Sequence, residues 1–381
     1  MTKEKVIPQI RFSGFTDTWE QRKLSDMVER VTRKNENRES ELPLTISAQY
    51  GLIDQNEFFD KRIASRDVSG YYLLKKGEFA YNKSTSSDAP WGAVKRLDRY
   101  EMGVLSTLYI VFALKENGNI DSNFLVSYYD TDCWHKGVQA IAAEGARNHG
   151  LLNITPADYF ETVLTVPSDV KEQHQIGSFF AKLDTLITLH QRKYDKLTKV
   201  KKAMLERMFP KNGSLYPEIR FKGFTDAWEQ RKVQDVADRF DNLRIPVAAN
   251  LRVHGTTPYY GANGIQDYVE GFTHDGEFVI VAEDGANDLK NYPVKCVNGR
   301  IWVNNHAHVL QGKAGIADNS FLAFAISQSD IESLLVGGGR AKLNAEALMS
   351  IEFRLPCLQE QYRIGEYLTQ LDNLITLHQR M

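Results

Sequence analysis

The chain has 381 residues, of which 42% are hydrophobic and 25% are charged, and its formal net charge is −2. This length predicts two domains, and the composition is typical of a soluble globular protein. It argues against a membrane-spanning protein, because no apolar run approaches the roughly 18 residues of a span. The charged start, followed by no apolar stretch, predicts a cytoplasmic protein without a secretory signal.

Charge is distributed unevenly along the chain. The negative net charge is unfavourable for nucleic-acid binding, which needs local positive potential. Basic residues are nevertheless grouped, as in Lys75–Lys76, Lys95–Arg96 and Lys201–Lys202, while acidic residues gather near positions 36–41. The distribution therefore permits a nucleic-acid interface that the net charge alone would not suggest.

Two segments occur twice. Residues 8–23 (PQIRFSGFTDTWEQRK) return as residues 217–232 (PEIRFKGFTDAWEQRK), and residues 183–192 (LDTLITLHQR) return as residues 371–380 (LDNLITLHQR). The offset is 209 for the first pair and 188 for the second, so the second copy is 21 residues shorter between them. This pattern indicates an internal duplication. The ends of each copy are kept, whereas residues 30–144 and 239–336 do not align by eye.

In chain order, we predict a first globular domain at residues 1–167, a long helix at 168–209, a second globular domain at 210–357 and a second helix at 358–381. Within the domains, Leu105–Phe112 and Phe278–Ala282 are apolar, β-prone runs separated by turn signals. The expected fold class is α+β, with mixed, strand-rich domains separated by long antiparallel coiled-coil helices in a pseudo-twofold repeat.

The long helix is predicted from apolar residues that recur at three- and four-residue steps after Pro167. Ser168–Asp169 can cap its start, and it should end before Pro210. About 35 residues of helix are ~50 Å long, which on duplex DNA is on the order of 15 base pairs. The apolar residues of the two helices that are candidates for docking another protein are Ile176, Phe179, Leu183, Leu186, Ile187, Ile364, Leu368, Leu371, Leu374 and Ile375.

The second helix is shorter than the first. Met381 aligns with Lys193, so the sequence contains no equivalents of Tyr194–Met208. Antiparallel packing about a pseudo-twofold axis would then leave the N-terminal half of the first helix partly unpaired. We expect a partner or a further tail to cover it.

Several patterns could indicate catalysis or metal binding. Asp88–Trp91 (DAPW) is close to an amino-methyltransferase loop but lacks the first proline of its Pro-Pro pair, and Asp275 or Asp284 with Asp288–Lys290 could form a magnesium nuclease site. His306 and His308 could bind a metal if an Asp or Cys joined them, although a structural pair is the simpler interpretation. No metal site and no catalytic residue is therefore predicted.

Glycine-rich segments carry the DNA-binding prediction. Gly337–Arg340 (GGGR) can approach phosphate through its backbone but lacks the Gly-Lys-Ser/Thr ending of a nucleotide loop, and Glu144–Gly150 occupies the corresponding place in the first copy. Base reading requires forked donors or amides at groove edges. The candidates are Asn82, Lys83, Ser84, Ser86, Lys95, Arg96, Arg147, Asn148, His149, Asn287, Lys290, Asn304, Asn305, Arg340, Lys342 and Asn344.

The sequence resembles the DNA specificity subunits of type I restriction-modification systems over nearly its whole length. The resemblance rests on the duplicated GFTDxWEQRK segments at Gly14 and Gly223, on residues 77–84 (GEFAYNKS) and 282–286 (AEDGA), and on the repeated LDxLITLHQR helix. It implies a non-catalytic subunit whose two domains each read one half of an asymmetric, bipartite site on double-stranded DNA.

The resemblance also implies partners: two adenine-N6 methyltransferase subunits docked on the helices, and two restriction subunits that translocate and cleave DNA. These partners would use S-adenosylmethionine, ATP and Mg²⁺, whereas the chain itself would need no cofactor. The short second helix departs from the family pattern and leaves one methyltransferase dock in doubt. Two alternatives stay open: a self-sufficient DNA nuclease or methyltransferase, and a coiled-coil scaffold that binds only proteins.

Overall fold

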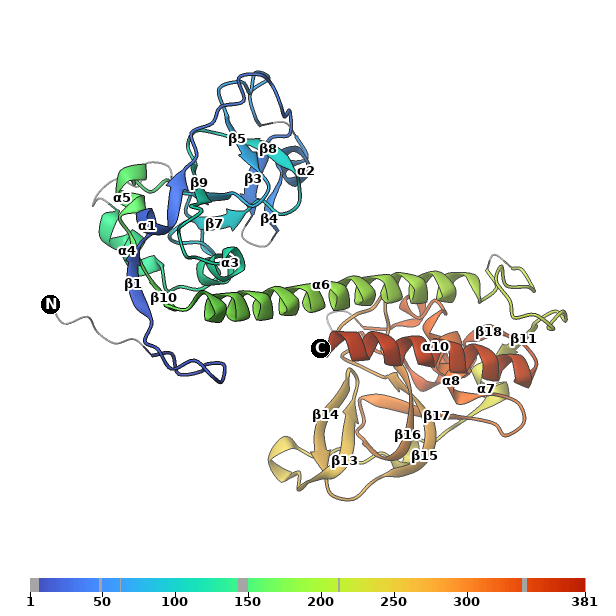
Figure 1. The fold of residues 1–381 in the computed structure, drawn as a ribbon. Coiled ribbons are helices and arrows are strands. Elements are labelled where there is room, and N and C mark those ends of the chain that lie inside the picture. The colour runs from blue at the N-terminus through green and yellow to red at the C-terminus, as the bar shows by residue number, and fades with distance from the viewer. Residues whose placement is uncertain are drawn as a thin grey trace. The chain divides into compact units, whose positions relative to one another are not determined.

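The computed structural model describes residues 7–47, 50–61, 63–142, 150–211, 213–337 and 341–380. Contacts divide the chain into two compact units, Met1–Leu186 and Ile187–Met381, and helix α6 (Val170–Arg207) passes through the boundary. The predicted α+β class is confirmed (Figure 1). No helix among the described residues is long and apolar enough to cross a membrane.

The first unit contains three small sheets and a central four-stranded sheet with the order β2-β9-β6-β7. The central strands are β2 (Val28–Arg30), β9 (Ile110–Leu114), β6 (Phe79–Asn82) and β7 (Ala93–Arg96). The two-stranded sheets pair β1 (Glu20–Lys23) with β10 (Val163–Val166), β3 (Leu44–Ser47) with β4 (Gly51–Asp54), and β5 (Tyr72–Lys75) with β8 (Met102–Leu105). Its helices are α1 (Leu24–Met27), α2 (Gln55–Phe59), α3 (Ser122–Tyr129), α4 (His135–Ile141) and α5 (Pro156–Phe160).

The apolar run at Leu105–Phe112 is not one strand. Leu105 ends β8, and Ile110 begins β9. Between them, the carbonyl of Ser106 accepts a hydrogen bond from the amide of Tyr109 at 3.2 Å, which closes a turn. The high β propensity of this run gives no sign of the turn. The run Phe278–Ala282, in contrast, lies within one strand, as predicted.

The second unit contains a six-stranded sheet with the order β12-β17-β15-β16-β13-β14. Figure 1 shows β15, β16 and β17 as neighbours. The strands are β12 (Ala237–Arg239), β17 (Ala307–Gly312), β15 (His274–Ala282), β16 (Val294–Val303), β13 (His254–Gly261) and β14 (Gly264–Val269), and a separate pair joins β11 (Glu229–Lys232) to β18 (Glu352–Leu355). The helices are α7 (Val233–Val236), α8 (Asn319–Ser327), α9 (Ala345–Ser350) and α10 (Leu358–Gln379), with 3-10 turns η1 (Asp241–Leu243), η2 (Ala249–Leu251) and η3 (Glu332–Leu334).

The two domains share one topology, including the parts that the sequence could not align. The order β2-β9-β6-β7 in the first corresponds to β12-β17-β15-β16 in the second, and β1-β10 corresponds to β11-β18. In each copy, the first residue of a short helix donates to the carbonyl of an equivalent loop: Leu24 N to Thr162 O at 2.8 Å, and Val233 N to Ile351 O at 3.0 Å. The duplication therefore extends to the core strands, whereas the described copies differ in β3-β4 and β5-β8 of the first and in β13-β14 of the second.

An arginine–glutamate pair fastens the repeated N-terminal segment to the start of the long helix in each copy. Arg11 Nε and Nη2 donate to the two carboxylate oxygens of Glu172 at 2.6 and 2.7 Å. Arg220 makes the same two bonds to Glu360 at 2.7 and 2.8 Å. Both carboxylates are buried, with 1% and 0% of the side chain exposed. In both copies, the repeated N-terminal segment therefore supplies the arginine of this contact.

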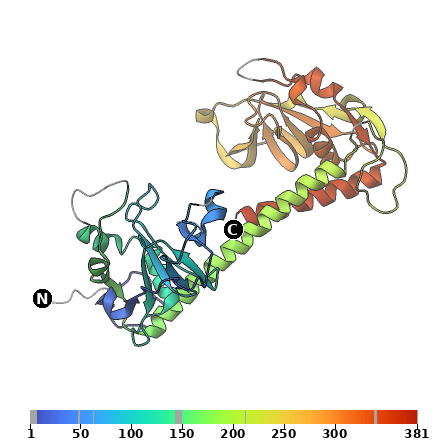
Figure 2. The same ribbon diagram turned by 90° about the horizontal axis from the view of Figure 1, so that it is seen from above.

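The C-terminal half of α6 packs against α10 (Figure 2). Lys201 forms an ion pair with Asp372, and His190 Nδ1 lies 2.9 Å from His378 Nδ1. Lys201 follows His190 in α6, whereas its partner Asp372 precedes His378 in α10, so the helices are antiparallel. His190 and His378 are equivalent in the repeat, and their direct contact marks the local pseudo-twofold axis.

Candidate nucleic-acid interface

The loop after the central strand occupies the same place in both domains. We call residues 83–92, after β6, and residues 283–293, after β15, the central-strand loops. In the first domain Lys83 O accepts from Leu152 N at 3.0 Å, and in the second Glu283 O accepts from Leu343 N at 2.7 Å. Bridges between Ser84 and Leu151 and between Asp284 and Lys342 complete the match. Each domain therefore places its central-strand loop beside the segment that follows a predicted glycine loop.

The glycine loops themselves fall largely outside the described residues. Gly150 and Gly337 are described, and Gly150 O accepts from Thr85 N at 2.7 Å. The candidates Arg147, Asn148, His149 and Arg340 lie outside the described residues. The equivalence of the two loops is therefore supported by the pairing that flanks them.

The first central-strand loop is a series of short polar turns. Asn82 Oδ1 accepts from Ser84 N at 3.0 Å, and Ser86 Oγ accepts from Ala89 N at 3.1 Å. Ser84 and Ser86 are exposed, whereas Lys83 is half-buried and its Nζ donates to Ile154 O at 3.3 Å. The two serines are thus the candidates of this loop that can meet a partner without rearrangement.

Lys95 and Arg96 on β7 are already engaged. Lys95 Nζ lies 2.6 Å from Asp130 Oδ1. Arg96 Nε lies 2.6 Å from Asp98 Oδ1, and its Nη1 donates to Ser122 Oγ at 2.7 Å. To reach a phosphate, each cation would first have to leave a carboxylate of its own domain.

The second central-strand loop is held by Asn263 at the β13–β14 turn. Asn263 Nδ2 donates to Gly285 O at 2.9 Å, and its Oδ1 accepts from Asn287 N at 2.9 Å. Asn287 and Lys290 are exposed. A loop fixed through its backbone leaves these two side chains on the surface, where base and phosphate contacts require them.

The carboxylates of the possible nuclease pattern do not form one cluster. Asp275 pairs with Arg300 at 3.2 Å, and Asp284 Oδ1 lies 2.6 Å from His306 Nδ1. Asp288 Oδ1 accepts from the amides of Lys290 and Asn291, each at 2.9 Å, so it closes a local turn. The geometry thus gives each carboxylate a separate structural partner.

Asn304 and Asn305 differ in accessibility. Asn304 is 4% exposed, and its Oδ1 accepts from His306 N at 2.8 Å. Asn305 is exposed at the turn before β17. We therefore assign a structural role to Asn304 and keep Asn305 as a candidate.

A charged pocket adjoins the second central-strand loop. His308 Nδ1 lies 2.7 Å from Asp241 Oδ2, and Arg244 Nη1 lies 2.7 Å from Glu283 Oε2. Lys342 Nζ lies 2.9 Å from Glu283 Oε1. The pocket is lined by Arg239, Asp241, Asn242, Arg244, Glu283, His308, Lys342, Asn344, Ala345 and Glu346.

The ligand atoms of Asp241, Glu283 and His308 lie within 4.8 Å of one another, which would suit a metal ion. Arg244 and Lys342 already pair with Glu283, and Arg244 Nη2 also lies 3.6 Å from Asp241 Oδ2. His306 and His308 have different acidic partners, so they do not form one ligand pair. This arrangement supports the structural interpretation of both histidines. The sequence missed Asp241 and Arg244, which lie more than 60 residues before His308.

This pocket predicts acid sensitivity of the second domain. Burial acts to raise the pKa of Asp241, but hydrogen bonds from His308 and Val309 and the charge of Arg244 together lower it. The pKa of Glu283 is also lowered, because bonds from Arg244 and Lys342 outweigh burial. A lowered folded-state pKa contributes stability above the unfolded value of about 4 and loses it as pH falls through the folded value.

We therefore expect the melting temperature of the wild type to fall more steeply on acidification below about pH 4 than that of Asp241→Asn. Scanning calorimetry at a series of pH values measures this difference. Parallel pH profiles of the two proteins would contradict the assignment.

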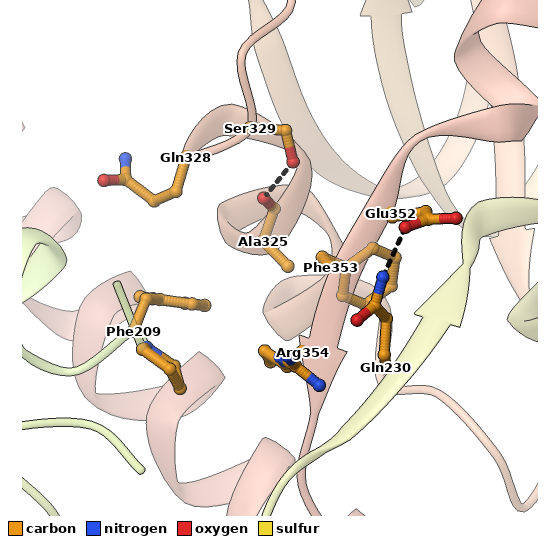
Figure 3. A pocket seen from close by; sticks show the side chains of 9 residues that line it. Phe209, Gln230, Ala325, Gln328, Ser329, Glu352, Phe353 and Arg354 are labelled. Atoms are coloured by element: carbon orange, nitrogen blue, oxygen red, sulfur yellow. Dashed lines mark hydrogen bonds between the residues drawn. The ribbon is translucent and has the colours of Figure 1, made fainter. Parts of the chain in front are cut away.

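A second pocket lies near the β11–β18 pair and α8 (Figure 3). Gln230 points to Glu352 and donates to its carboxylate, while Ser329 Oγ donates to Ala325 O at 3.1 Å. Phe209 and Phe353 supply much of its apolar wall. None of the predicted DNA-binding residues lines this pocket.

The predicted docking residues differ in how far their side chains are exposed. Ile364, Leu368 and Leu371 are buried, with 2%, 0% and 7% exposed. Leu186 and its equivalent Leu374 are 51% and 41% exposed. The three buried residues belong to the core of the second domain, whereas Leu186 and Leu374 remain available to another protein. Ile176 and Ile375 are half-buried, and Phe179, Leu183 and Ile187 are exposed.

Comparisons with known proteins agree with this architecture. The family model described as "Type I restriction modification DNA specificity domain" matches residues 225–381. The putative type I restriction enzyme specificity subunit S.HindORF215P of Haemophilus influenzae is 42% identical over 164 residues, which are 43% of this chain and 42% of that protein. A putative MjaX specificity subunit of Methanocaldococcus jannaschii is 21% identical over 99% of this chain and 92% of its own length.

The type I restriction-modification S subunit from M. genitalium has the same fold, with a TM-score of 0.66 over 98% of this chain and 94% of that chain, at 13% identity. Two domains that share a core topology, with equivalent loops that differ in sequence and a paired long helix, define an internally duplicated protein. The chain is thus similar to DNA specificity subunits of type I restriction-modification systems, and it spans less than half the length of the Haemophilus influenzae relative.

Proposed function

We propose that each domain reads one half of a bipartite site on double-stranded DNA. The observation that carries the proposal is the equivalent pairing of the two central-strand loops with the segments after Gly150 and after residue 341. Equal placement on one topology keeps the two reading surfaces alike in position. Unequal side chains on those loops make the two half-sites different, so the target is asymmetric.

The exposed side chains of the loops are the ones assigned to DNA. Asn287 and Asn305 can form paired hydrogen bonds with adenine, and Ser84 and Ser86 can bond either base edges or phosphate. Lys290 supplies a phosphate contact, because its ammonium is exposed. Other candidates already have partners within the domains, which DNA would have to displace: Lys83, Lys95, Arg96, Asn304 and Lys342.

The same proposal gives the partners. Two methyltransferase subunits and two restriction subunits assemble with the chain, and they use S-adenosylmethionine, ATP and Mg²⁺. The exposed leucines at positions 186 and 374 supply apolar contacts for the methyltransferase subunits. The domain boundaries proposed for this function are residues 1–167 and 210–357, with the helices between and after them.

Domain exchange tests the proposal. Residues 1–167 are replaced by the equivalent domain of another family member, and the hybrid is assembled with its methyltransferase subunit. Methylated positions are then mapped in a library of random DNA. We expect one half-site to change while the other is retained. A continuous site, or a change in both halves, would refute the assignment.

Lys290→Ala tests the phosphate contact. The change should weaken DNA binding about equally on all sequences and reduce the slope of log K against log salt by about 0.9. Lys171→Ala, an exposed lysine at the start of α6, is the control and should leave the slope unchanged. Fluorescence anisotropy of labelled duplex at several salt concentrations gives both slopes. An unchanged slope in Lys290→Ala would remove this lysine from the interface.

The alternative of a self-sufficient enzyme makes a different prediction. It requires DNA cleavage with Mg²⁺ alone, or methyl transfer from S-adenosylmethionine, by the isolated chain. Such activity should disappear in Asp288→Ala or Asp88→Ala. The local turn that Asp288 closes favours the non-catalytic function.

A further inference from the structure

His308 is a buried residue of β17, with 1% of its surface exposed, and both of its ring nitrogens have partners. Nε2 lies 2.9 Å from the carbonyl oxygen of Leu343, and Nδ1 lies 2.7 Å from Oδ2 of Asp241. Both are distances of direct hydrogen bonds. The ring therefore bridges η1 and the segment at residues 342–344.

The two acceptors determine how many protons the ring carries. The carbonyl oxygen of Leu343 can only accept, so Nε2 must donate. Asp241 is held in its ionised form, because its Oδ1 accepts from Val309 N at 2.8 Å and its Oδ2 lies 3.6 Å from Arg244 Nη2. An ionised carboxylate can also only accept, so Nδ1 must donate as well. Because a neutral imidazole has only one N–H, the geometry requires an imidazolium at His308.

The charged side chains around the ring agree with this state. Two carboxylates contact Nδ1, that of Asp241 at 2.7 Å and that of Glu283 at 3.7 Å. The other charged residues that line the pocket are Arg239 of β12, Arg244 after η1, Lys342 and Glu346 of α9. Arg239 and Arg244 pair with Asp241, and Lys342 pairs with Glu283. Each basic side chain is thus paired, and the two carboxylates favour the imidazolium over the neutral ring.

His308 fastens the segment that follows the predicted glycine loop of the second domain. Leu343, which is 0% exposed, accepts from His308 through its carbonyl and donates through its amide to Glu283 O at 2.7 Å. The same segment includes Lys342, which pairs with the Glu283 carboxylate. Histidine is the side chain whose charge changes near neutral pH. The position of this segment beside the second central-strand loop therefore depends on a dissociable proton.

The first domain has an apolar residue at the equivalent place. Ile110 pairs with the last-but-one residue of β6, as His308 pairs with the last-but-one residue of β15. The valine after each accepts an equivalent backbone bond, Val111 from Val31 N and Val309 from Phe240 N. The corresponding segment of the first domain is thus positioned without a histidine.

We propose that His308, as an imidazolium, is the positioning residue of the second DNA-reading surface. Its two hydrogen bonds hold residues 342–344 beside the second central-strand loop. When the ring loses one proton, Nδ1 presents a lone pair to Asp241, and the ring can no longer keep both bonds. The proposal rests on the DNA-reading function proposed above. It implies that rising pH weakens contact with the second half-site and leaves contact with the first unchanged.

Asp241→Asn distinguishes the proton from the ring itself. The Oδ1 atom of Asn can still accept from Val309 N, and its Nδ2 can donate to Nδ1 of a neutral His308. The neutral ring then keeps its N–H for Leu343. We therefore expect this variant to hold the segment at every pH at which the wild type releases it.

Hydrogen exchange tests the anchor without DNA. Protection of the Leu343 amide, corrected for the intrinsic exchange rate, is measured in the full chain from about pH 6 to about pH 9 in buffers with EDTA. In the wild type, protection should fall about tenfold as pH rises, because a charge-assisted hydrogen bond is lost. It should stay constant in Asp241→Asn. The amide of Leu152, which makes the equivalent bond in the first domain, is the internal control.

DNA binding tests the consequence. The chain is assembled with its methyltransferase subunit, and its affinity for a duplex with the mapped site is divided by its affinity for a duplex with a replaced second half-site. This ratio cancels pH effects common to both duplexes. It should fall about tenfold with rising pH in the wild type and stay constant in Asp241→Asn. His254→Gln, which changes an exposed histidine of the same domain, should behave as the wild type does.

The outcomes separate the anchor from the function on which it rests. Leu343 protection that does not change with pH in the wild type would overturn the proposal, and so would an equal fall in Asp241→Asn. A pH-dependent anchor in a complex that binds no DNA at any pH would refute the DNA-reading function and, with it, the positioning role. Parallel falls of protection and of the affinity ratio in the wild type alone support both.

Discussion

Glu360→Ala should lower the free energy of unfolding of the second domain by about 3 kcal/mol, because breaking a buried ion pair leaves a charge without its partner. The carboxylate of Glu360 is fully buried, and it accepts two bonds from Arg220, which is 14% exposed. The burial of Arg220 also means that water cannot fully replace the lost oxygens. This pair joins residues 140 positions apart. Its loss should free the repeated segment at residues 217–232 from the start of α10.

Thermal unfolding measures this loss. For a domain of this size, about 3 kcal/mol corresponds to a melting temperature about 6 to 12 °C lower. Glu366→Ala, an exposed position on the same helix, is the matched control, because it removes the same side chain without a buried partner. Equal melting temperatures for Glu360→Ala and Glu366→Ala would contradict the anchoring role of the pair.

Gly177→Ala is the second substitution with a large expected effect. A Cβ atom at this position would lie 2.3 Å from Phe124 N and 2.6 Å from Asn123 C, and these backbone atoms begin helix α3. Overpacking of this kind costs about 1–3 kcal/mol, since α6 and α3 must separate to accept the methyl group. We expect a lower melting temperature and faster amide exchange in α3.

The matched control is Gly70→Ala, where an added Cβ meets no atom within 4 Å. The equivalent of Gly177 in the second copy is Gly365, whose Cβ would lie 2.6 Å from Asp318 Oδ1 and 3.0 Å from Phe321 N. Gly365→Ala should therefore be destabilising through loss of the Asp318 cap on α8. If Gly177→Ala melts as Gly70→Ala does, the close approach of the helices is not what requires glycine.

The repeat and the long helix could be predicted from the sequence. The duplicated segments identified the repeat, and the three- and four-residue spacing of apolar side chains predicted α6, which spans Val170–Arg207. Asp169, predicted as a cap, accepts a hydrogen bond from Lys171 N at 2.8 Å. These features depend on neighbours along the chain, so local patterns specify them.

The candidate site was less accessible to sequence reasoning. Lys95 and Arg96 were predicted from charge alone, and only the fold shows that Asp130 and Asp98 hold them. Asn304 has the right chemistry for adenine but is buried. Whether a polar side chain can contact a partner depends on its burial and on ion pairs between residues distant in the sequence. The amino-acid composition gives no information on either.

The sequence by itself determined the duplication, the two helices and the family resemblance, because these reside in repeated local patterns. The tertiary structure decided that the divergent middles share the order of four core strands and that the two central-strand loops pair with equivalent segments. It also decided that Leu368 of α10 is buried whereas its equivalent Phe180 of α6 is exposed. Each of these depends on contacts between residues tens to hundreds of positions apart. Such contacts arise only when hydrogen bonds and burial bring the folded segments together.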